Sequence, residues 1–495
     1  MIAALILVPI LAGLLMYAVP RSSENLAKAI GVVVAFGAFV ATLVSRDAPD
    51  ETLVWLQRPF TASFHVGLGS SGATAASYWI VLLLALATGC ALLVARLPRM
   101  RDFVAQMLVL LGAMTGVFVA RDLLLFALFW DLMLIPVFLV LVAWSPTKTS
   151  ATAWKYLIYN LCGGLALLLA VAAYGISAGS TDVIGKVALP LAGQLPESAE
   201  LWIFSGFALA FLIKTPVFPL HTWMPDTYAD LPAPMAAVVS AVQSKAGLYG
   251  FIVIGLALFP HAMHAAVTPM FVLGSLSLLY GAFAALVQDD AKRIVAYSSL
   301  SHLGLIVLGI FSFSPLAIGG AIVYIVAHGL FSAGLFMTLG EVEVREDTRA
   351  LSRLGGLAAR NPKLGGALTI VSLAALGLPG LCGFAGEILI LTGLYQSGHH
   401  KLTILALIPI VLAAAYMLRA FQGMMHGPEV QDVPQRPDMS PLEILALAPL
   451  VVAIVLLGID PGPVGFGRGA APAIEQVPQA FHSGVTLRGS LAVTK

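Results

Sequence analysis

The chain has 495 residues, of which 59% are hydrophobic and only 10% are charged, and its formal net charge is +1. Soluble domains carry about 25% charged residues, so this composition excludes an ordinary soluble domain. The near-neutral balance also argues against a polyanionic partner such as nucleic acid.

Apolar runs long enough to cross a bilayer recur along the chain and predict an all-α polytopic membrane protein with about 14 transmembrane helices. The first run lacks a basic leader and a small-residue cleavage site, which favours a retained span over a signal peptide. The spans are predicted near residues 2–19, 27–45, 76–96, 103–120, 122–143, 156–177, 200–225, 232–258, 267–287, 295–312, 316–340, 364–396, 402–424 and 441–459.

The loops between these spans are unequally basic, and this bias predicts the orientation of the chain. We call the face of the N-terminus side A and the opposite face side B. Sixteen basic residues fall on side B, namely Arg21, Lys28, Arg96, Arg99, Arg101, Lys148, Lys155, Lys292, Arg293, Arg345, Arg349, Arg353, Arg360, Lys363, Arg419 and Arg436. Eight fall on side A, namely Arg46, Arg58, Arg121, Lys186, Lys401, Arg468, Arg488 and Lys495. We therefore expect side B in the cytoplasm and both termini outside.

Two features of the sequence could suggest a bound cofactor, but neither of them predicts one. Residues 67–72 fit the pattern G-x-G-x-x-G, but no βαβ unit surrounds them, so nucleotide binding is not predicted. Cys90, Cys162 and Cys382 are far apart in apolar runs and form no C-x-x-C pair. This spacing argues against iron–sulfur or zinc ligation and suggests three small core residues.

Four charged residues lie deep inside predicted spans: Asp131 in the fifth, Lys214 in the seventh, Lys245 in the eighth and Glu387 in the twelfth. A charge at the bilayer centre costs roughly 2.5–3.5 kcal/mol on insertion scales. Lysines near a span end can extend to the headgroups, but these two are too deep for that. A static ion pair between Asp131 and one lysine remains an alternative, although it leaves the other lysine unexplained.

Two predicted spans are interrupted, the seventh by Pro216 and Pro219 and the twelfth at residues 378–380. Broken helices at membrane depth are tolerated only where protein or a polar cavity covers the freed backbone. Two interruptions five spans apart predict two five-helix repeats, and an odd number of spans makes these repeats inverted. The predicted units are 1–102 (helices 1–3), 103–258 (first repeat), 259–425 (second repeat) and 426–495 (last helix and polar tail).

Two histidines, His302 and His328, also lie within spans, and His221 lies near the end of the broken seventh span. Burial disfavours a charged ammonium, so a buried lysine can release its proton, while a nearby carboxylate opposes that release. Histidine titrates near neutral pH. The predicted site is therefore a proton relay of Asp131, Lys214, Lys245, His302, His328 and Glu387.

Simpler interpretations of the relay residues remain open. Either histidine could be a satisfied core residue, and Glu387 could be held by backbone groups at the interruption of its span. In the relay interpretation, the break at Pro216 admits water beside Lys214.

Four segments of the chain are similar to a known family: residues 211–251, which include "FLIKTPVFPLHTWMPD", and residues 289–310, 326–337 and 376–391. They resemble the antiporter-like subunits of respiratory complex I, NADH:quinone oxidoreductase, over roughly residues 75–425. Mrp-type cation/proton antiporters and membrane-bound hydrogenases contain related subunits. The resemblance implies fourteen spans, two inverted five-helix repeats and a central polar axis along which protons move.

The resemblance also implies roles in the first repeat. Asp131 matches the acidic position of the fifth span, Lys214 the lysine of the broken seventh span, and Lys245 the bridging lysine of the eighth. Asp131 departs from the family pattern, in which glutamate is usual. The shorter side chain withdraws the carboxylate from Lys214, and water can bridge such a gap.

In the second repeat, His302 and His328 match the polar positions that link the two halves, and Glu387 matches the terminal residue of the broken twelfth span. Glutamate at that position favours the M-type subunit, which is homologous to mitochondrial subunit four. The last predicted span ends near residue 459 and is not followed by a lateral-helix extension, which favours the same type.

The expected function is that of a proton-translocating membrane subunit of an enzyme, a respiratory NADH (or other donor):quinone oxidoreductase in the bacterial inner membrane. No redox centre is recognisable in the chain, so FMN, iron–sulfur clusters and quinone are expected in partner subunits. Expected partners are other membrane subunits, including further antiporter-like ones, and indirectly a peripheral redox arm. The alternatives are a subunit of an Mrp-type sodium/proton antiporter, or the membrane module of a hydrogenase-linked or inorganic-carbon-concentrating complex.

Overall fold

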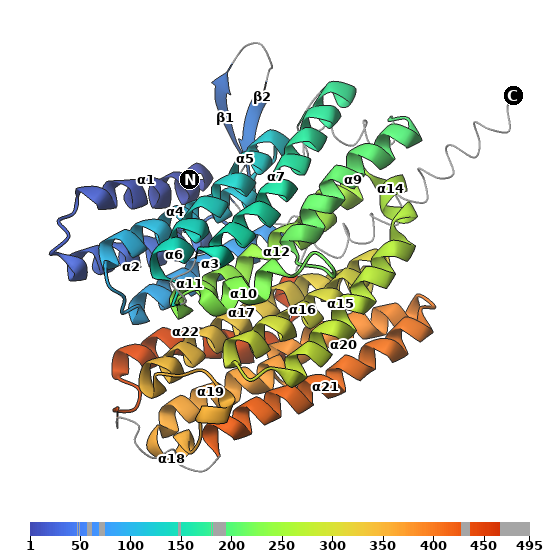
Figure 1. Ribbon diagram of the computed structural model, residues 1–495. Helices are drawn as coiled ribbons and strands as arrows, with labels where there is room; N and C mark the ends of the chain where they lie inside the picture. Colours follow the sequence, from blue (N-terminus) through green and yellow to red (C-terminus); the bar gives the residue numbers. More distant parts are fainter. Residues whose placement is uncertain are drawn as a thin grey trace, which may run out of the picture.

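The computed structural model describes residues 1–46, 48, 50–56, 62–68, 75–146, 150–179, 181, 195–426 and 436–465. These residues form a bundle of tilted helices from which one β-hairpin projects (Figure 1). Eleven helices within these ranges are long and apolar enough to cross a membrane, and two shorter apolar helical stretches cover Ile2–Ala18 and Pro362–Ala375. The chain is an integral membrane protein.

The elements of the first half are α1 (Ile2–Leu15), η1 (Met16–Ala18), α2 (Glu24–Val44), β1 (Glu51–Leu56), β2 (Ala62–Val66), α3 (Ala75–Val94), α4 (Met100–Val119), α5 (Leu123–Leu132), α6 (Leu134–Trp144), α7 (Ala151–Ala178), α9 (Glu197–Lys214), α10 (Trp223–Asp230), α11 (Ala233–Val238), η3 (Val239–Gln243), α12 (Lys245–Gly250), η4 (Phe251–Gly255) and α13 (Leu256–Leu258). The turns η3 and η4 are π-helical.

The elements of the second half are α14 (Pro260–Ala265), α15 (Val267–Val287), α16 (Ala291–Phe311), α17 (Pro315–Glu346), η5 (Leu351–Arg353), α18 (Leu357–Arg360), α19 (Pro362–Ala375), α20 (Cys382–Gln396), α21 (His400–Met425), α22 (Pro441–Ile459) and α23 (Gly462–Gly465).

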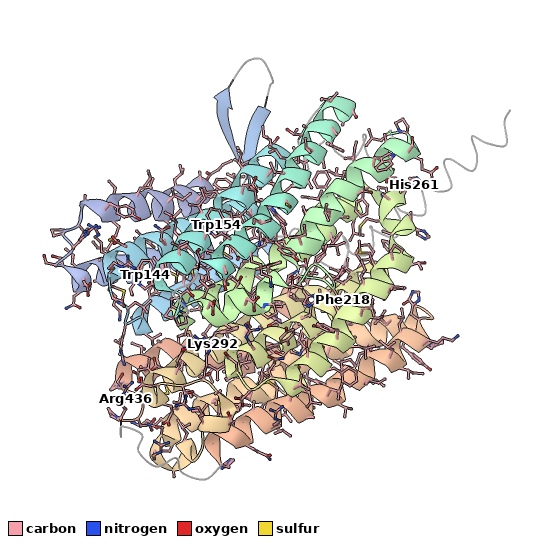
Figure 2. The ribbon with its side chains drawn as sticks, viewed as in Figure 1. Trp144, Trp154, Phe218, His261, Lys292 and Arg436 are labelled. Atoms are coloured by element: carbon pink, nitrogen blue, oxygen red, sulfur yellow. The ribbon has the colours of Figure 1, made fainter. Side chains whose placement is uncertain are left out.

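The helices at the centre of the bundle differ from those at its edge in how much of their surface is covered. The most apolar stretches of residues 233–258 and of α17 are entirely buried, whereas those of α7 and α21 are one-third buried. The outer helices expose apolar side chains such as Trp154 and Ile404, and Figure 2 shows Trp154 on α7. Lipid or partner subunits can cover such faces without the cost of leaving polar groups in hydrocarbon.

Both predicted interruptions are present. α9 ends at Lys214, and α10 begins at Trp223. In the second half, α19 ends at Ala375 and α20 begins at Cys382. The two π-helical turns between Ala233 and Leu258 were not predicted, because no proline falls within either turn to mark it.

The hairpin is a further difference from the all-helical prediction. Within the described ranges, β1 and β2 are the only strands, and they pair antiparallel with Glu51 opposite Val66. Gly67 continues from β2 and donates its N–H to the carbonyl of Val119 at the end of α4, over 2.8 Å. Residues 69–72 of the glycine motif lie outside the described residues.

The prediction that all three cysteines are core residues is wrong for Cys162. Cys90 and Cys382 are buried, whereas Cys162 is exposed on the outer face of α7, where it needs no polar partner because lipid can cover a thiol. Several basic residues used for orientation lie outside the described part of the chain, as does the tail from residue 466: Arg58, Lys148, Lys186, Arg468, Arg488 and Lys495.

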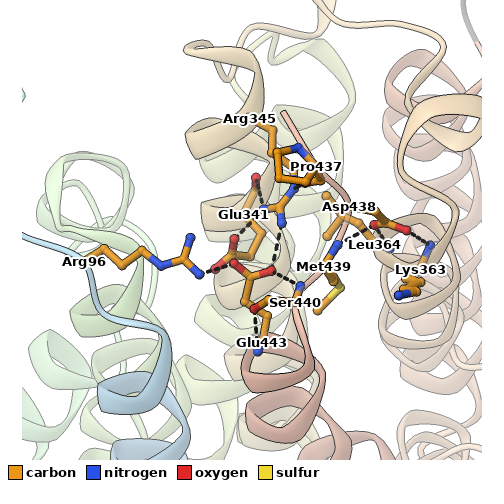
Figure 3. Close-up of polar contacts among 10 residues, drawn as sticks. All are labelled: Arg96, Glu341, Arg345, Lys363, Leu364, Pro437, Asp438, Met439, Ser440 and Glu443. Carbon is orange, nitrogen blue, oxygen red and sulfur yellow. Dashed lines mark hydrogen bonds and ion pairs between the residues drawn. The ribbon is translucent and has the colours of Figure 1, made fainter. Parts of the chain in front are cut away.

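Ion pairs around the buried Glu443 join helices α17 and α22 and the segment after α3 on side B (Figure 3). The Arg345 guanidinium of α17 contacts Glu341 at 2.5 Å and Glu443 of α22 at 2.8 Å. Arg96, just after α3, also pairs with Glu443. Glu443 completes a capping box with Ser440 at the start of α22. The network therefore ties the last helix to the centre of the bundle.

Candidate functional site

Lys214 is the last residue of α9 and is almost completely buried, with 1% exposure. Its Nζ has no hydrogen-bond partner among the described residues. It lies 5.1 Å from the centre of the Trp130 ring, where the face of the indole attracts a cation. A helix C-terminus also favours positive charge. Thus Lys214 is held by a ring and a helix dipole, and not by a fixed ion pair.

Asp131 lies next to Trp130, close to the point where α5 meets α6. Its carboxylate rests on Gly164 of α7, so that a Cβ placed on that glycine would stand 2.9 Å from Asp131 Cγ. Asp131 Oδ1 has no hydrogen-bond partner within the described ranges, and the neighbouring Trp130 carries the ring that lies over Lys214. Asp131 and Lys214 are therefore held near each other without the direct bond that a static ion pair requires.

Lys245 opens α12 directly after the π-helical turn η3 and Ser244, and it is fully buried. Its Nζ donates to the backbone carbonyl of Ser240 and, over 3.3 Å, to Ser244 Oγ. Ser332 of α17 donates to Ser240 Oγ over 2.8 Å. π-Helical turns are frequent at functional sites, and here the turn supplies the acceptor for the lysine.

His302 of α16 and His328 of α17 face each other with ring centres 5.5 Å apart. Both are buried, and none of their four ring nitrogens has a hydrogen-bond partner among the residues described. A core histidine satisfied by the protein would show at least one such bond. His328 lies one turn before Ser332 on α17, and Ser332 bonds to Ser240 of the turn that also accepts a bond from Lys245.

Glu387 lies early in α20, just past the second interruption. Tyr324 of α17 donates its hydroxyl to Glu387 Oε1 over 2.5 Å, and the Tyr324 ring lies 5.7 Å from that of His302. Glu387 Oε2 rests on Gly377, whose φ of +76° suits glycine. The partner of Glu387 is thus a side chain of another helix rather than the local backbone.

The structure brings the predicted residues into two groups. Asp131 and Lys214 form one, and the other runs from Lys245 through the two histidines and Tyr324 to Glu387. Carboxylate, amine, imidazole and phenol can each give or accept a proton. Within the described ranges, no cluster of three or more His, Cys, Asp or Glu side chains could hold a metal.

Sequence reasoning missed the polar residues between the predicted ones. Tyr324, His328 and Ser332 recur every fourth residue, so one face of α17 carries all three, and this spacing could have identified Tyr324. Trp130 could not be found in this way, because its contact with Lys214 depends on how α5 packs near α9.

Residues 120–413 match the family described as NADH:quinone oxidoreductase/Mrp antiporter, TM. The chain belongs to this family. It is 33% identical over 395 residues to NADH-quinone oxidoreductase subunit M of Rhodobacter capsulatus, covering 78% of this chain and 77% of that protein. It is 31% identical over 483 residues to NAD(P)H-quinone oxidoreductase chain 4 3 of Trichormus variabilis, covering 93% and 88%.

Two solved structures have the same fold as this chain. A chain of respiratory complex I from Thermus thermophilus with bound NADH superposes with a TM-score of 0.87 at 31% identity, covering 97% of this chain and all of that one. A chain of the Mrp complex from Dietzia sp. superposes with a TM-score of 0.82 at 20% identity, covering 96% and 98%. The second likeness concerns the fold alone. The family fold is therefore common to oxidoreductase and antiporter complexes.

Proposed function

We propose that this chain is a proton-translocating membrane subunit of a respiratory NADH (or other donor):quinone oxidoreductase, of the M type. The observation that carries this function is the buried series from Lys245 to Glu387, in which the two histidines between these residues have no hydrogen-bond partner within the described ranges. The chain would act within an enzyme whose FMN, iron–sulfur clusters and quinone belong to partner subunits. Further antiporter-like subunits would be its neighbours in the membrane.

The proposed architecture comprises fourteen spans, with residues 103–258 and 259–425 as inverted repeats between the helices of residues 1–102 and the last span and tail of 426–495. The interrupted helices support this division. α9 is followed by a break and α10, and α19 is followed by a break and α20, five spans later. Each repeat then has one buried charge at its interruption, Lys214 in the first and Glu387 in the second.

Side B is proposed to face the cytoplasm of a bacterial inner membrane, with both termini outside. A cavity of about 370 Å³ lies on side B, lined by residues that include Ala233, Lys292, Glu341 and Arg436. Figure 2 labels Lys292 and Arg436. Lys245 lies further along the helical segment that begins at Ala233, and His328 lies on α17. Both residues are deeper in the bundle than the cavity. None of the relay residues lines this cavity, and we propose it only as the side-B end of the path toward them.

In the proposed mechanism, Lys214 exchanges a proton when the influence of Asp131 changes. Lys245 and the two histidines pass a proton across the middle of the bundle, and Glu387 releases it on the far side. Tyr324 holds Glu387 by a hydrogen bond. Electron transfer would take place in partner subunits and would be coupled to this pathway.

Replacement of Lys214 tests this function. Lys214→Ala should lower proton pumping by the assembled complex about a hundredfold or more, the lower end of the effect of losing a proton-transfer group. Lys214→Arg should also impair pumping, because guanidinium stays protonated. Pumping is measured with a pH-sensitive dye in sealed vesicles, and assembly by native electrophoresis. Wild-type pumping by a fully assembled Lys214→Arg variant would refute the role of Lys214.

The orientation has its own test. Single cysteines at Ser397 and Ser352, both exposed, should react with a membrane-impermeant thiol reagent from opposite sides. Cys162 is replaced by serine in both variants because it is the exposed native cysteine. Ser397 should label in intact cells and Ser352 only after the membrane is opened. Labelling of both in intact cells would reject the proposed topology.

An Mrp-type sodium/proton antiporter subunit is the alternative, since the Dietzia likeness shows the same fold. Neighbouring genes distinguish the two: flavin and iron–sulfur subunits indicate the oxidoreductase, and small antiporter subunits indicate the alternative.

A further inference from the structure

We propose that Trp223, Tyr156 and Gln243, called the aromatic bridge below, hold Lys214 and Lys245 in a fixed relation and so couple the two lysines. This role rests on the proposed function, because it concerns the same proton pathway. In the described part of the chain, no hydrogen bond joins Lys214 directly to Lys245. The bridge is one connection through which one lysine can respond to the other, beside the direct packing of Gly247 of α12 against Phe211 and Thr215 next to Lys214.

The bridge begins at the interruption after α9. In a continuous helix, the N–H of Val217 would bond to the carbonyl of Ile213, but here it bonds to Leu212 over 3.0 Å. Trp223, the first residue of α10, donates its indole N–H to the Ile213 carbonyl over 3.0 Å. Ile213 directly precedes Lys214. Trp223 thus satisfies a buried acceptor that the break would otherwise leave without a donor, and it fixes the peptide group beside the lysine.

The middle of the bridge is an aromatic contact between α10 and α7. The rings of Trp223 and Tyr156 are fully buried, with centres 5.5 Å apart and planes at 67°. This edge-to-face arrangement is favourable beyond the burial of its area. Interiors are packed too densely for one ring to move alone, so a displacement of α10 moves Tyr156.

The bridge ends at the π-helical turn η3. Gln243, the last residue of that turn, donates its Nε2 to the Tyr156 hydroxyl over 2.7 Å. Two residues later, Lys245 donates to the Ser240 carbonyl of the same turn. A change at the break is therefore transmitted to the acceptor of Lys245 through three contacts in series.

The bridge positions the lysines and does not carry the charge itself. Indole and carboxamide do not exchange protons near neutral pH, and the Tyr156 hydroxyl accepts a bond from Gln243. The titratable groups around the bridge are Asp131, next to Trp130; His328, one turn before Ser332 on α17; His302, whose ring lies 5.5 Å from that of His328; and the buried Tyr228 of α10.

The test uses substitutions that remove one bond and retain most of the volume: Trp223→Phe, Tyr156→Phe and Gln243→Met, each in the assembled complex. The control is Trp202→Phe, the same change on α9 at a side chain that is 81% exposed. Rates of proton pumping and of quinone reduction are measured from pH 5.5 to 9, with assembly checked by native electrophoresis.

Each bridge variant should lower pumping about three- to tenfold, the effect of losing one buried hydrogen bond. All three should displace the pH dependence of turnover in the same direction, by about half a unit or more, whereas Trp202→Phe should not. The double variant Trp223→Phe/Gln243→Met should be no worse than the poorer single variant, because both changes open the same series of contacts.

Additive losses in the double variant, or unchanged pH profiles in all three single variants, would overturn the bridge. If Trp223→Phe does not assemble, the result for Tyr156→Phe decides whether the bridge proposal holds, since this change keeps the ring contact and removes only the hydroxyl. Failure of the bridge is separable from failure of the proposed function. If the bridge variants pump at the wild-type rate while Lys214→Ala is inactive, the bridge alone is rejected. If Lys214→Ala pumps at the wild-type rate, both the bridge and the proposed function are rejected.

Discussion

Tyr324 of α17 donates its hydroxyl to the Glu387 carboxylate of α20 over 2.5 Å, in the second turn of the helix that follows the interruption between α19 and α20. The bond joins the buried acid at the break to the helix that carries His328. It places a phenol within the predicted series of acid, lysines and histidines.

Tyr324→Phe should therefore slow pumping about tenfold, since hydrogen bonds to charged groups are worth about 1.5–3 kcal/mol. Glu387→Gln should impair pumping at least as much. The double variant should equal Glu387→Gln alone, because the hydroxyl acts through the acid. The measurements are dye-detected pumping and the proton-to-electron ratio in sealed vesicles. Full activity of the assembled Tyr324→Phe complex would remove this hydroxyl from the pathway.

The position of Asp131 can be tested from the opposite helix. Gly164→Ala would place a methyl group against the Asp131 carboxylate, 2.9 Å from Cγ, and should lower pumping several-fold by displacing it. Gly163→Ala is the matched control, because the nearest atom to its Cβ would be Ile213 Cδ1 at an ordinary 3.4 Å. Equal activity of the two alanine variants would show that the placement of the carboxylate on α7 is unimportant.

The second interruption offers another matched pair. Gly377 and Gly380 both have positive φ, +76° and +90°, so alanine at either costs about 1 kcal/mol of backbone strain. Only Gly377 lies under the Glu387 carboxylate, while a Cβ at Gly380 would meet nothing within 4 Å. Gly377→Ala should therefore impair proton release far more than Gly380→Ala at similar levels of assembled complex. Comparable losses of proton release in the two alanine variants would show that backbone strain, and not contact with Glu387, causes the effect.

The side-B ion pairs should contribute to stability rather than to proton transfer. Arg345→Leu leaves Glu341 and Glu443 buried without their shared cation and should destabilise the protein by about 3–5 kcal/mol. Arg96→Leu removes a cation that is 51% exposed and should cost about 1 kcal/mol or less. Thermal unfolding of the detergent-solubilised complex measures both. A larger loss for Arg96→Leu would show that Arg96, and not Arg345, anchors α22.

Much of this protein was determined by the sequence itself. Membrane insertion and the positions of most helices follow from apolar runs, because hydrocarbon forces the backbone to satisfy its own hydrogen bonds. Proline marked the break after Lys214, and a Pro-Gly pair marked the break before Glu387, since these residues cannot continue a helix. The six relay residues stood out because charge or imidazole is costly in such runs.

Only the tertiary structure decided which of these groups meet. No pattern along α17 or α20 shows that Tyr324 reaches Glu387, and nothing near Trp130 shows that its ring lies over Lys214. Such contacts join residues far apart in the chain and depend on how whole helices pack. The same holds for Cys162, whose apolar surroundings in sequence did not distinguish a core from a lipid-facing position. In a membrane, the protein core and the surrounding lipid are both apolar. Hydrophobicity therefore shows that a helix is inserted, but it does not show which face of the helix points into the protein.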